Sequence, residues 1–166
     1  MLRAVLGLLC LMVWAGVADA CPGGPTAIDP LHVLAGRLRT PLTAEVRAGG
    51  TVPLELCDGV PGTGNIPFDP SASILYVADR KRMDLEVRTE GDCDTVILLR
   101  TPTGRWFFDD DNGGERNARI RIAAPREGKY EIWVGSQEGR ACETKLSLQT
   151  FRSVVRLAAT PRARRI

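Results

Sequence analysis

Histidine is nearly missing from this sequence: the 166 residues contain one, His32. A lone histidine in a segment rich in glycine and proline is more often an exposed or capping residue than a general base. Also missing are a Cys-x-x-Cys pair and the Gly-Lys-Ser/Thr end of a phosphate-binding loop. These absences argue against zinc binding, thiol redox catalysis and a P-loop nucleotide site.

Long apolar runs are missing too, except at the N-terminus. Residues 1–20 begin with Arg3 as the positive group, continue with an apolar stretch and end in Ala-Asp-Ala. This is the pattern of a secretory signal peptide with its cleavage site. The stretch is shorter than the roughly 20 residues that cross a bilayer, and no later stretch approaches that length. We therefore expect an exported chain, periplasmic or secreted, with no membrane span.

Removing the signal peptide leaves four cysteines, and an even number in an exported chain predicts disulfides. Cys93 and Cys142 each come just before an expected strand, whereas Cys21 and Cys57 lie in coil rich in glycine and proline. Of the three pairings that four cysteines allow, these like contexts favour Cys93–Cys142 and Cys21–Cys57. The alternative is lipidation of Cys21, but the residues around it match the lipidation pattern poorly and one thiol would be left without a partner.

A predominance of one sign of charge is lacking, because the sequence contains 22 basic and 20 acidic residues. Only three of the basic residues are lysine. Arginines interleaved with acids do not indicate a nucleic-acid partner. The exception is the tail at 152–166, which has five arginines and no acid. Such a tail either contacts phosphates or anionic lipid, or is simply solvated.

What the sequence does have is alternation of apolar and polar residues. Residues 21–40 show little of it and are expected to form an irregular N-terminal extension. Within 41–151 the alternating apolar positions are Val52, Leu54, Leu56, Met83, Leu85, Val87, Ile120, Ile122, Tyr130, Ile132, Val134, Leu146 and Leu148. Period two with one apolar face is typical of antiparallel strands over a core. We therefore predict an all-β domain at 41–151, an antiparallel β-sandwich without substantial helix, in which 96–100 is a strand buried on both faces.

The densest polar cluster is the run Asp109-Asp110-Asp111-Asn112, and Asp92 and Asp94 precede the strand before it. Consecutive carboxylates repel one another unless they are solvated or bridged by a cation, and calcium prefers oxygen ligands. The alternative is a polar hairpin loop without metal. A hydrolase that uses Asp109 and Asp111 as a carboxylate pair is disfavoured, because a surface turn lacks the buried environment that separates two pKa values.

Five motifs occur in order between residues 83 and 148. They are Asp92-x-Asp94-Thr-Val-Ile-Leu, Thr101-Pro-Thr-Gly104, Asp109-Asp-Asp, Ile120-x-Ile122-x-Ala-Pro125 and Gly128-Lys-Tyr130-Glu-Ile-Trp-Val134. In this order they resemble the bacterial pre-peptidase C-terminal domain family, which comprises small secreted β-sandwiches often appended to exported proteases. The resemblance implies a jelly-roll-like sandwich that serves binding, targeting or stability of secreted partners. No protease sequence accompanies it here, so a stand-alone role is expected.

Some members of that family bind calcium between the first motif and the acidic turn. The resemblance therefore implies Asp94, Asp109 and Asp111 as calcium ligands, with Asp92 and Asn112 behind them. A hairpin turned at 101–104 would also return Asp109 and Asp111 to the end where Asp94 begins its strand. A neighbouring arginine that neutralises these carboxylates is the rival to calcium.

Two functions remain in view. The first is a non-enzymatic exported module that binds a secreted protein or a polysaccharide; Trp133, on the polar side of its strand, suggests a contact surface unless it packs under a loop. The second is a periplasmic inhibitor of a protease or lysozyme. An inhibitor needs a rigid protruding loop, and the candidate is 58–67, held at its base by Cys57.

Overall fold

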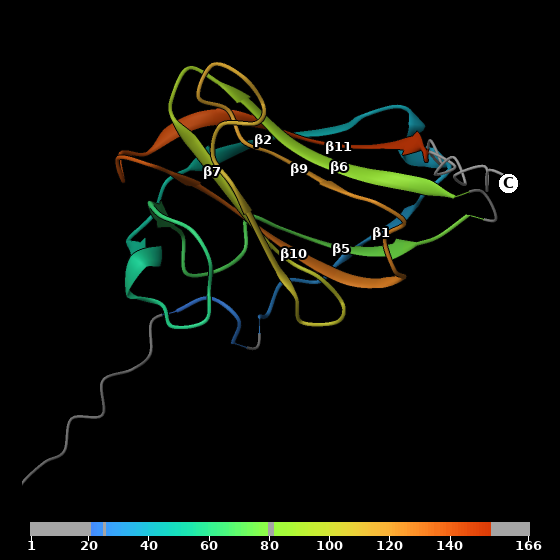
Figure 1. Ribbon diagram of the computed structural model, residues 1–166, viewed down its shortest axis with the longest axis horizontal. Coiled ribbons are helices and arrows are strands. Elements are labelled where there is room, and N and C mark those ends of the chain that lie inside the picture. The colour runs from blue at the N-terminus through green and yellow to red at the C-terminus, as the bar shows by residue number, and fades with distance from the viewer. Residues whose placement is uncertain (1–20, 25, 80–81, 154–166) are drawn as a thin grey trace, which may run out of the picture.

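The computed structural model describes residues 21–24, 26–79 and 82–153, and these form two layers of β-strands (Figure 1). The predicted signal peptide at 1–20 lies outside the described residues, as does the basic tail from 154 onward. Within the described ranges the only helical elements are two short 3-10 turns, η1 (Arg37–Arg39) and η2 (Leu54–Leu56). The predicted all-β class is confirmed.

The sandwich consists of a four-stranded and a seven-stranded sheet. The first has the order β2 (Leu42–Ala48), β11 (Cys142–Arg152), β6 (Met83–Gly91) and β9 (Arg119–Ile122), all antiparallel. The second contains β1 (Leu31–Leu34), β5 (Ala72–Val77), β10 (Gly128–Ser136), β7 (Thr95–Arg100) and β8 (Trp106–Asp109), with the short β3 (Val52–Pro53) and β4 (Asn65–Ile66) beside β10. Strand β10 is central, because it pairs with β5 and β4 as well as with β7.

The main core fills the space between the two sheets, as the alternation predicts. The alternating apolar residues of β6, β9, β10 and β11 are all buried there. Since each buried methylene contributes about 0.8 kcal/mol, this inward face is what keeps the two sheets together. The predicted hairpin is also confirmed: β7 pairs antiparallel with β8, and the amide of Gly104 donates to the carbonyl of Thr101 at 2.9 Å to close the turn.

A second, smaller apolar cluster lies on the outer face of the seven-stranded sheet. It contains Val96 and Leu98 of β7 together with Trp133, and the segment from β3 to β4 covers it. Strand β7 is therefore buried on both faces, as expected, with Ile97 and Leu99 facing the main core. Because of this second cluster, several positions that look solvent-facing by alternation are interior.

Three details of the prediction are wrong. The N-terminal extension is not irregular throughout, because β1 pairs with β5 and buries Val33 in the core; that pair is parallel, so the sandwich is not purely antiparallel. The alternation beginning at Val52 does not produce a long strand. Strand β3 ends at Pro53, which has no amide hydrogen for a ladder, and the chain turns into η2. Leu56 then lies on the surface, 77% exposed.

Candidate functional site

Both predicted disulfides are present. Cys21–Cys57 has a Cα–Cα distance of 5.5 Å and ties the start of the described chain to the residue after η2. Cys93–Cys142 has a Cα–Cα distance of 6.4 Å and joins the residues before β7 to the first residue of β11. Cys93 lies in the link from β6 to β7, and β6 is the partner of β11, so the second disulfide fastens this link to the start of β11.

Trp133 does not form a contact surface, and that prediction is wrong. Its side chain is fully buried (0% exposed), its ring lies 5.5 Å from the ring of Trp106, and its indole N–H donates to the carbonyl of Phe68 at 3.2 Å. The physical reason is the second apolar cluster: the chain around β3 and β4 folds over this part of the outer face. The alternative, that Trp133 packs under a loop of its own chain, is confirmed.

The loop at 58–67, which we call the anchored loop, is fixed to the sandwich at both ends. At its start Cys57 is held by the disulfide, and its amide donates to the carbonyl of Leu54 at 3.0 Å. Toward its end the amide of Leu54 donates to the carbonyl of Gly64 at 2.9 Å, and the amide of Gly64 donates to a carboxylate oxygen of Glu55 at 2.8 Å. The hydrogen bonds that this carboxylate accepts from the amide of Gly64 and from the amide of Glu55 itself lower the pKa of Glu55, so it is ionised and accepts well at neutral pH.

The middle of the anchored loop is also held. Gly62 has φ +108° and packs so closely on the ring of Phe108 that a Cβ atom would overlap it. The side-chain amide of Gln137 donates to the hydroxyl of Thr63 at 2.8 Å. The outward side chains of the loop, from Asp58 to Thr63, remain mostly exposed. In Figure 1 the loop lies at one end of the molecule, on the left, beside η2.

The predicted calcium ligands are distributed differently from the expectation. Asp109 is only 7% exposed, and its carboxylate accepts from the amide of Arg119 at 2.7 Å, from the amide of Asn112 at 3.0 Å and from the side-chain amide of Asn112. Asp109 and Asn112 therefore build the turn after β8, as an aspartate that caps its own loop does. Among the residues that the structure describes, no three carboxylate, cysteine or histidine side chains group closely enough to hold a metal ion.

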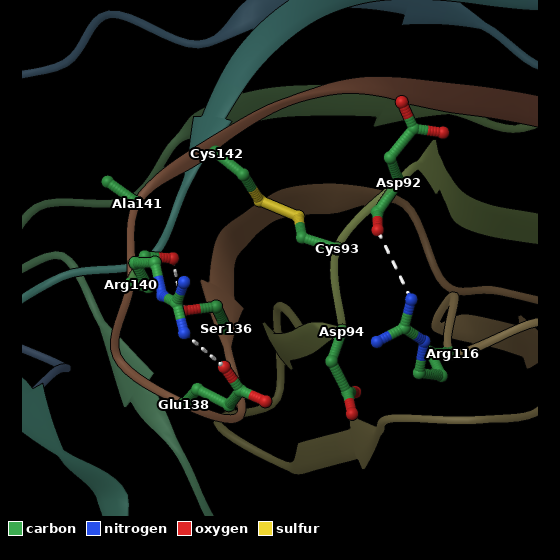
Figure 2. A pocket seen from close by; sticks show the side chains of 9 residues that line it. All are labelled: Asp92, Cys93, Asp94, Arg116, Ser136, Glu138, Arg140, Ala141 and Cys142. Carbon is green, nitrogen blue, oxygen red and sulfur yellow. Dashed lines mark hydrogen bonds and ion pairs between the residues drawn. A yellow bond between two sulfur atoms is a disulfide. The ribbon is translucent and has the colours of Figure 1, made fainter.

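Asp94 and Asp92 line a cavity of about 320 Å³ beside the Cys93–Cys142 disulfide (Figure 2). In Figure 2 the Asp94 side chain extends away from the disulfide, while the guanidinium of Arg116 reaches the backbone carbonyl of Asp92 at 3.3 Å. The opposite side is closed by an ion pair between Arg140 and Glu138 at 3.1 Å. We call this cavity the acidic pocket.

Electrostatics in the acidic pocket centre on Asp94. Partial burial raises its pKa above 3.8, and the nearby charge of Asp111 raises it further, whereas Arg116 acts in the opposite direction. The charges of Asp94 and Asp111 are thus close enough to repel each other. Arg116 is the nearby cation that opposes this repulsion. Calcium binding stays a prediction.

Two residues at the anchored loop could not be recognised from the sequence. The alternation places Leu56 on an inward strand face, but the turn into η2 brings it to the surface. By the same alternation Glu55 is a polar position of that strand, whereas in the structure it accepts from Gly64 and closes the anchored loop.

The described chain is thus a two-sheet β-sandwich with two disulfides, and no helix among its described residues has the length and apolar character needed to cross a membrane. No protein-family model matches the chain, and no curated protein matches it. Among solved structures it is similar to PliG of Aeromonas hydrophila, a periplasmic lysozyme inhibitor of g-type lysozyme. That alignment has 14% identity and a TM-score of 0.35, and covers 73% of this chain and 96% of that chain. A TM-score of this size does not establish a shared fold.

Proposed function

We propose that the protein is an exported, non-enzymatic accessory module that binds another secreted or periplasmic protein through the anchored loop. The observation that carries this proposal is the fixation of the loop by the Cys21–Cys57 disulfide, by the Glu55–Gly64 hydrogen bond and by the packing of Gly62 on Phe108. A loop held in one conformation loses little conformational entropy on binding, so more of its contact energy appears as affinity.

The surface around the loop supports a protein partner over a polysaccharide. Leu56, directly before the loop, exposes most of its apolar side chain, and Phe68, directly after it, is 57% exposed. Exposed apolar side chains of this kind are buried when a protein partner docks. Trp133, the residue expected to form a contact surface for a protein or a polysaccharide, is interior and supports neither partner.

Export and the absence of catalysis are parts of the same proposal. Two disulfides form and persist in oxidising compartments, in agreement with the signal-peptide pattern at 1–20. His32 is exposed on β1, and Asp109 is committed to a turn. The resemblance to pre-peptidase C-terminal domains points to the same accessory role and remains a prediction, as does a structural calcium ion near Asp94 and Asp111.

A narrower version of this function is inhibition of a protease or lysozyme. Inhibitors of this kind commonly insert a rigid loop into the enzyme's cleft, and the anchored loop has the fixed ends and the exposed outward side chains that such insertion requires. In this version the partner is an enzyme, and binding would abolish its activity.

The test uses the mature protein immobilised and exposed to periplasmic extract, with and without chelator, followed by activity assays against a panel of purified lysozymes and secreted proteases. Leu56→Asp should abolish capture of any specific partner. Leu34→Asp is the matched control, because Leu34 is a similarly exposed leucine (53%) on β1, a strand distant from the loop in sequence. Equal loss in both variants, or no loss in Leu56→Asp, would refute the role of the loop. Capture without inhibition of any enzyme in the panel would favour the accessory role over the inhibitor.

A further inference from the structure

A cavity of about 330 Å³ lies at the end of β10 opposite the anchored loop. Two turns form it, one at 101–105 between β7 and β8 and one at 122–126 between β9 and β10, and Phe107 and Tyr130 contribute aromatic walls. We call it the arginine pocket. Ligand cavities range from about 300 to 1,000 Å³, so its volume suits one small chemical group. Its position separates it from the anchored loop, because Ser136 at the far end of β10 pairs with Asn65 within that loop, whereas Gly128 packs against Pro102 of the first turn.

Three arginines and no acidic residue line the arginine pocket. Arg121 is neutralised from outside the pocket by Asp84 at 3.3 Å and Glu86 at 4.0 Å. Arg105 and Arg126 make no ion pair within the described part of the chain. Two positively charged guanidinium groups that line one cavity without an acidic partner favour the binding of an anion there.

Both unpaired arginines are held at their backbones. Thr101 fixes Arg105: its amide donates to the carbonyl of Arg105 at 2.9 Å, and its hydroxyl accepts from the amide of Arg105 at 3.1 Å. The guanidinium of Arg105 lies over the ring of Phe107, 4.9 Å from its centroid. The carbonyl of Arg126 accepts from the phenol of Tyr130 at 2.8 Å, and burial raises the pKa of Tyr130 to about 12, so this donor stays protonated.

The turn that carries Arg126 has an unusual backbone. Ala124 has φ +46°, a left-handed conformation that an L-residue adopts only when its surroundings impose it. Its amide donates to Asp84, the same carboxylate that pairs with Arg121. Glu127, the acid next to Arg126 in sequence, is directed elsewhere, since it accepts from the amide of Ala78 at 3.0 Å. The turn thus presents Arg126 to the cavity without a competing carboxylate among its lining residues.

We propose that the arginine pocket binds an anionic oxygen group, a carboxylate or a phosphate, between the guanidiniums of Arg105 and Arg126. Guanidinium forks match both groups, and the aromatic walls suit an anion attached to a ring with an apolar face, as in a sugar acid or a sugar phosphate. This site is separate from the loop proposed to bind a protein, so either proposal can fail without the other.

The experiment titrates glucuronate, inorganic phosphate and glucose into the isotopically labelled mature protein at constant ionic strength, following backbone amide shifts by NMR. The test variant is Arg105→Gln with Arg126→Gln. The matched control is Arg47→Gln with Arg119→Gln, which removes the same charge from two exposed arginines that do not line the pocket. Neither pair is in the core, and the variants' amide spectra report directly whether the fold is kept.

We expect at least one anion to cause saturable amide shifts at Thr103, Arg105, Ala124 and Arg126. The affinity for that anion should be weaker by about tenfold or more in the test variant and unchanged in the control. If only glucuronate saturates the site, the ligand is a sugar carboxylate. If only phosphate saturates it, the ligand carries a phosphate. Saturation by both shows that the site accepts either anion. The proposal is overturned if neither anion saturates, if glucose binds equally well, or if the control weakens as much as the test variant.

Discussion

At the scale of single residues, the decisive observation is how much of the outer surface of the seven-stranded sheet is covered. Trp133 follows Lys129 and Glu131 at period two, and by alternation it belongs on the solvent side of β10. It is interior because residues around β3 and β4 lie over this half of the strand, with the carbonyl of Phe68 accepting from the indole. The other half of β10 is covered differently. There Lys129 pairs with the buried Glu131 at 2.8 Å, and the hydroxyl of Thr26 donates to Glu131 and accepts from Lys129, both at 3.1 Å.

Gly62 is the residue on which the conformation of the anchored loop depends most directly. Gly62→Ala should destabilise the protein by about 1–3 kcal/mol, because the added methyl overlaps the Phe108 ring and the positive φ is strained for alanine. Urea unfolding of both proteins measures the difference.

Gly59→Ala is the control for Gly62→Ala, since Gly59 also has a positive φ (+76°) but no heavy atom within 4 Å of the added methyl. Its effect should be about 1 kcal/mol or less. Equal losses in the two variants would contradict the packing of Gly62 on Phe108.

Asp94 predicts a dependence of stability on pH. Its pKa is raised in the folded state, so ionised Asp94 destabilises the fold at neutral pH, and this destabilisation disappears as the pH falls below the ordinary value of 3.8. Asp94→Asn should therefore raise the melting temperature near pH 7, with a gain of less than about 0.5 kcal/mol in the free energy of unfolding. Near pH 3 the melting temperature should change little. The exposed Asp92 serves as control, as Asp92→Asn removes the same charge. A gain that persists at acid pH would contradict an origin in the ionised carboxylate.

At the scale of elements, strands with one face on the core were predictable from sequence alone. In β6, β9 and β11 the alternating apolar residues point inward because each of these strands has one face on the same core. The β7–β8 hairpin was predictable as well, since Thr101 to Gly104 contains its own turn sequence. These features depend on interactions close along the chain or on a single apolar face.

The elements that sequence missed depend on contacts distant along the chain. Strand β1 exists because it adds to the edge of β5, with Leu31 opposite Ile74, and nothing in its four residues specifies that partner. The end of β3 at Pro53 was visible in principle, but the turn into η2 also depends on the disulfide at Cys57 and on the Glu55–Gly64 hydrogen bond. For the same reason the sequence could place the anchored loop but not its contacts.

The Cys93–Cys142 disulfide fastens the link between β6 and β7 to the start of β11 and should contribute strongly to stability. Its sequence separation is 49, for which the chain-entropy model gives about 4 kcal/mol. Replacing both cysteines by alanine should therefore lower the melting temperature markedly. Strand-type circular dichroism should persist at low temperature if the core suffices. Free thiols detected in the native protein would contradict the pairing.

At the scale of the whole molecule, the two ends of β10 carry different surfaces. The anchored loop and the acidic pocket lie near the Ser136 end, since Ser136 both pairs with β4 and lines that pocket. The arginine pocket lies at the Gly128 end. A domain of this size can therefore bind a protein at one end and a small anion at the other without steric competition.

Calcium, if it binds, should stabilise the molecule through Asp94 and Asp111. The prediction is that millimolar calcium raises the melting temperature of the wild-type protein and that chelator lowers it, whereas Asp94→Asn responds to neither. Thermal unfolding of the two proteins in both conditions measures this. An unchanged wild-type melting temperature would leave Arg116 as the group that neutralises these carboxylates.

The order of the cysteines has a consequence for biogenesis. Each disulfide joins neighbours in the series, Cys21 with Cys57 and Cys93 with Cys142, so the two covalent loops do not overlap. During translocation from the N-terminus, the first pair emerges before either member of the second. Oxidation in order of emergence then produces the native connectivity without reshuffling, which otherwise takes seconds to hours. An export host that lacks disulfide isomerase but retains its thiol oxidase should consequently accumulate correctly cross-linked protein at the normal yield.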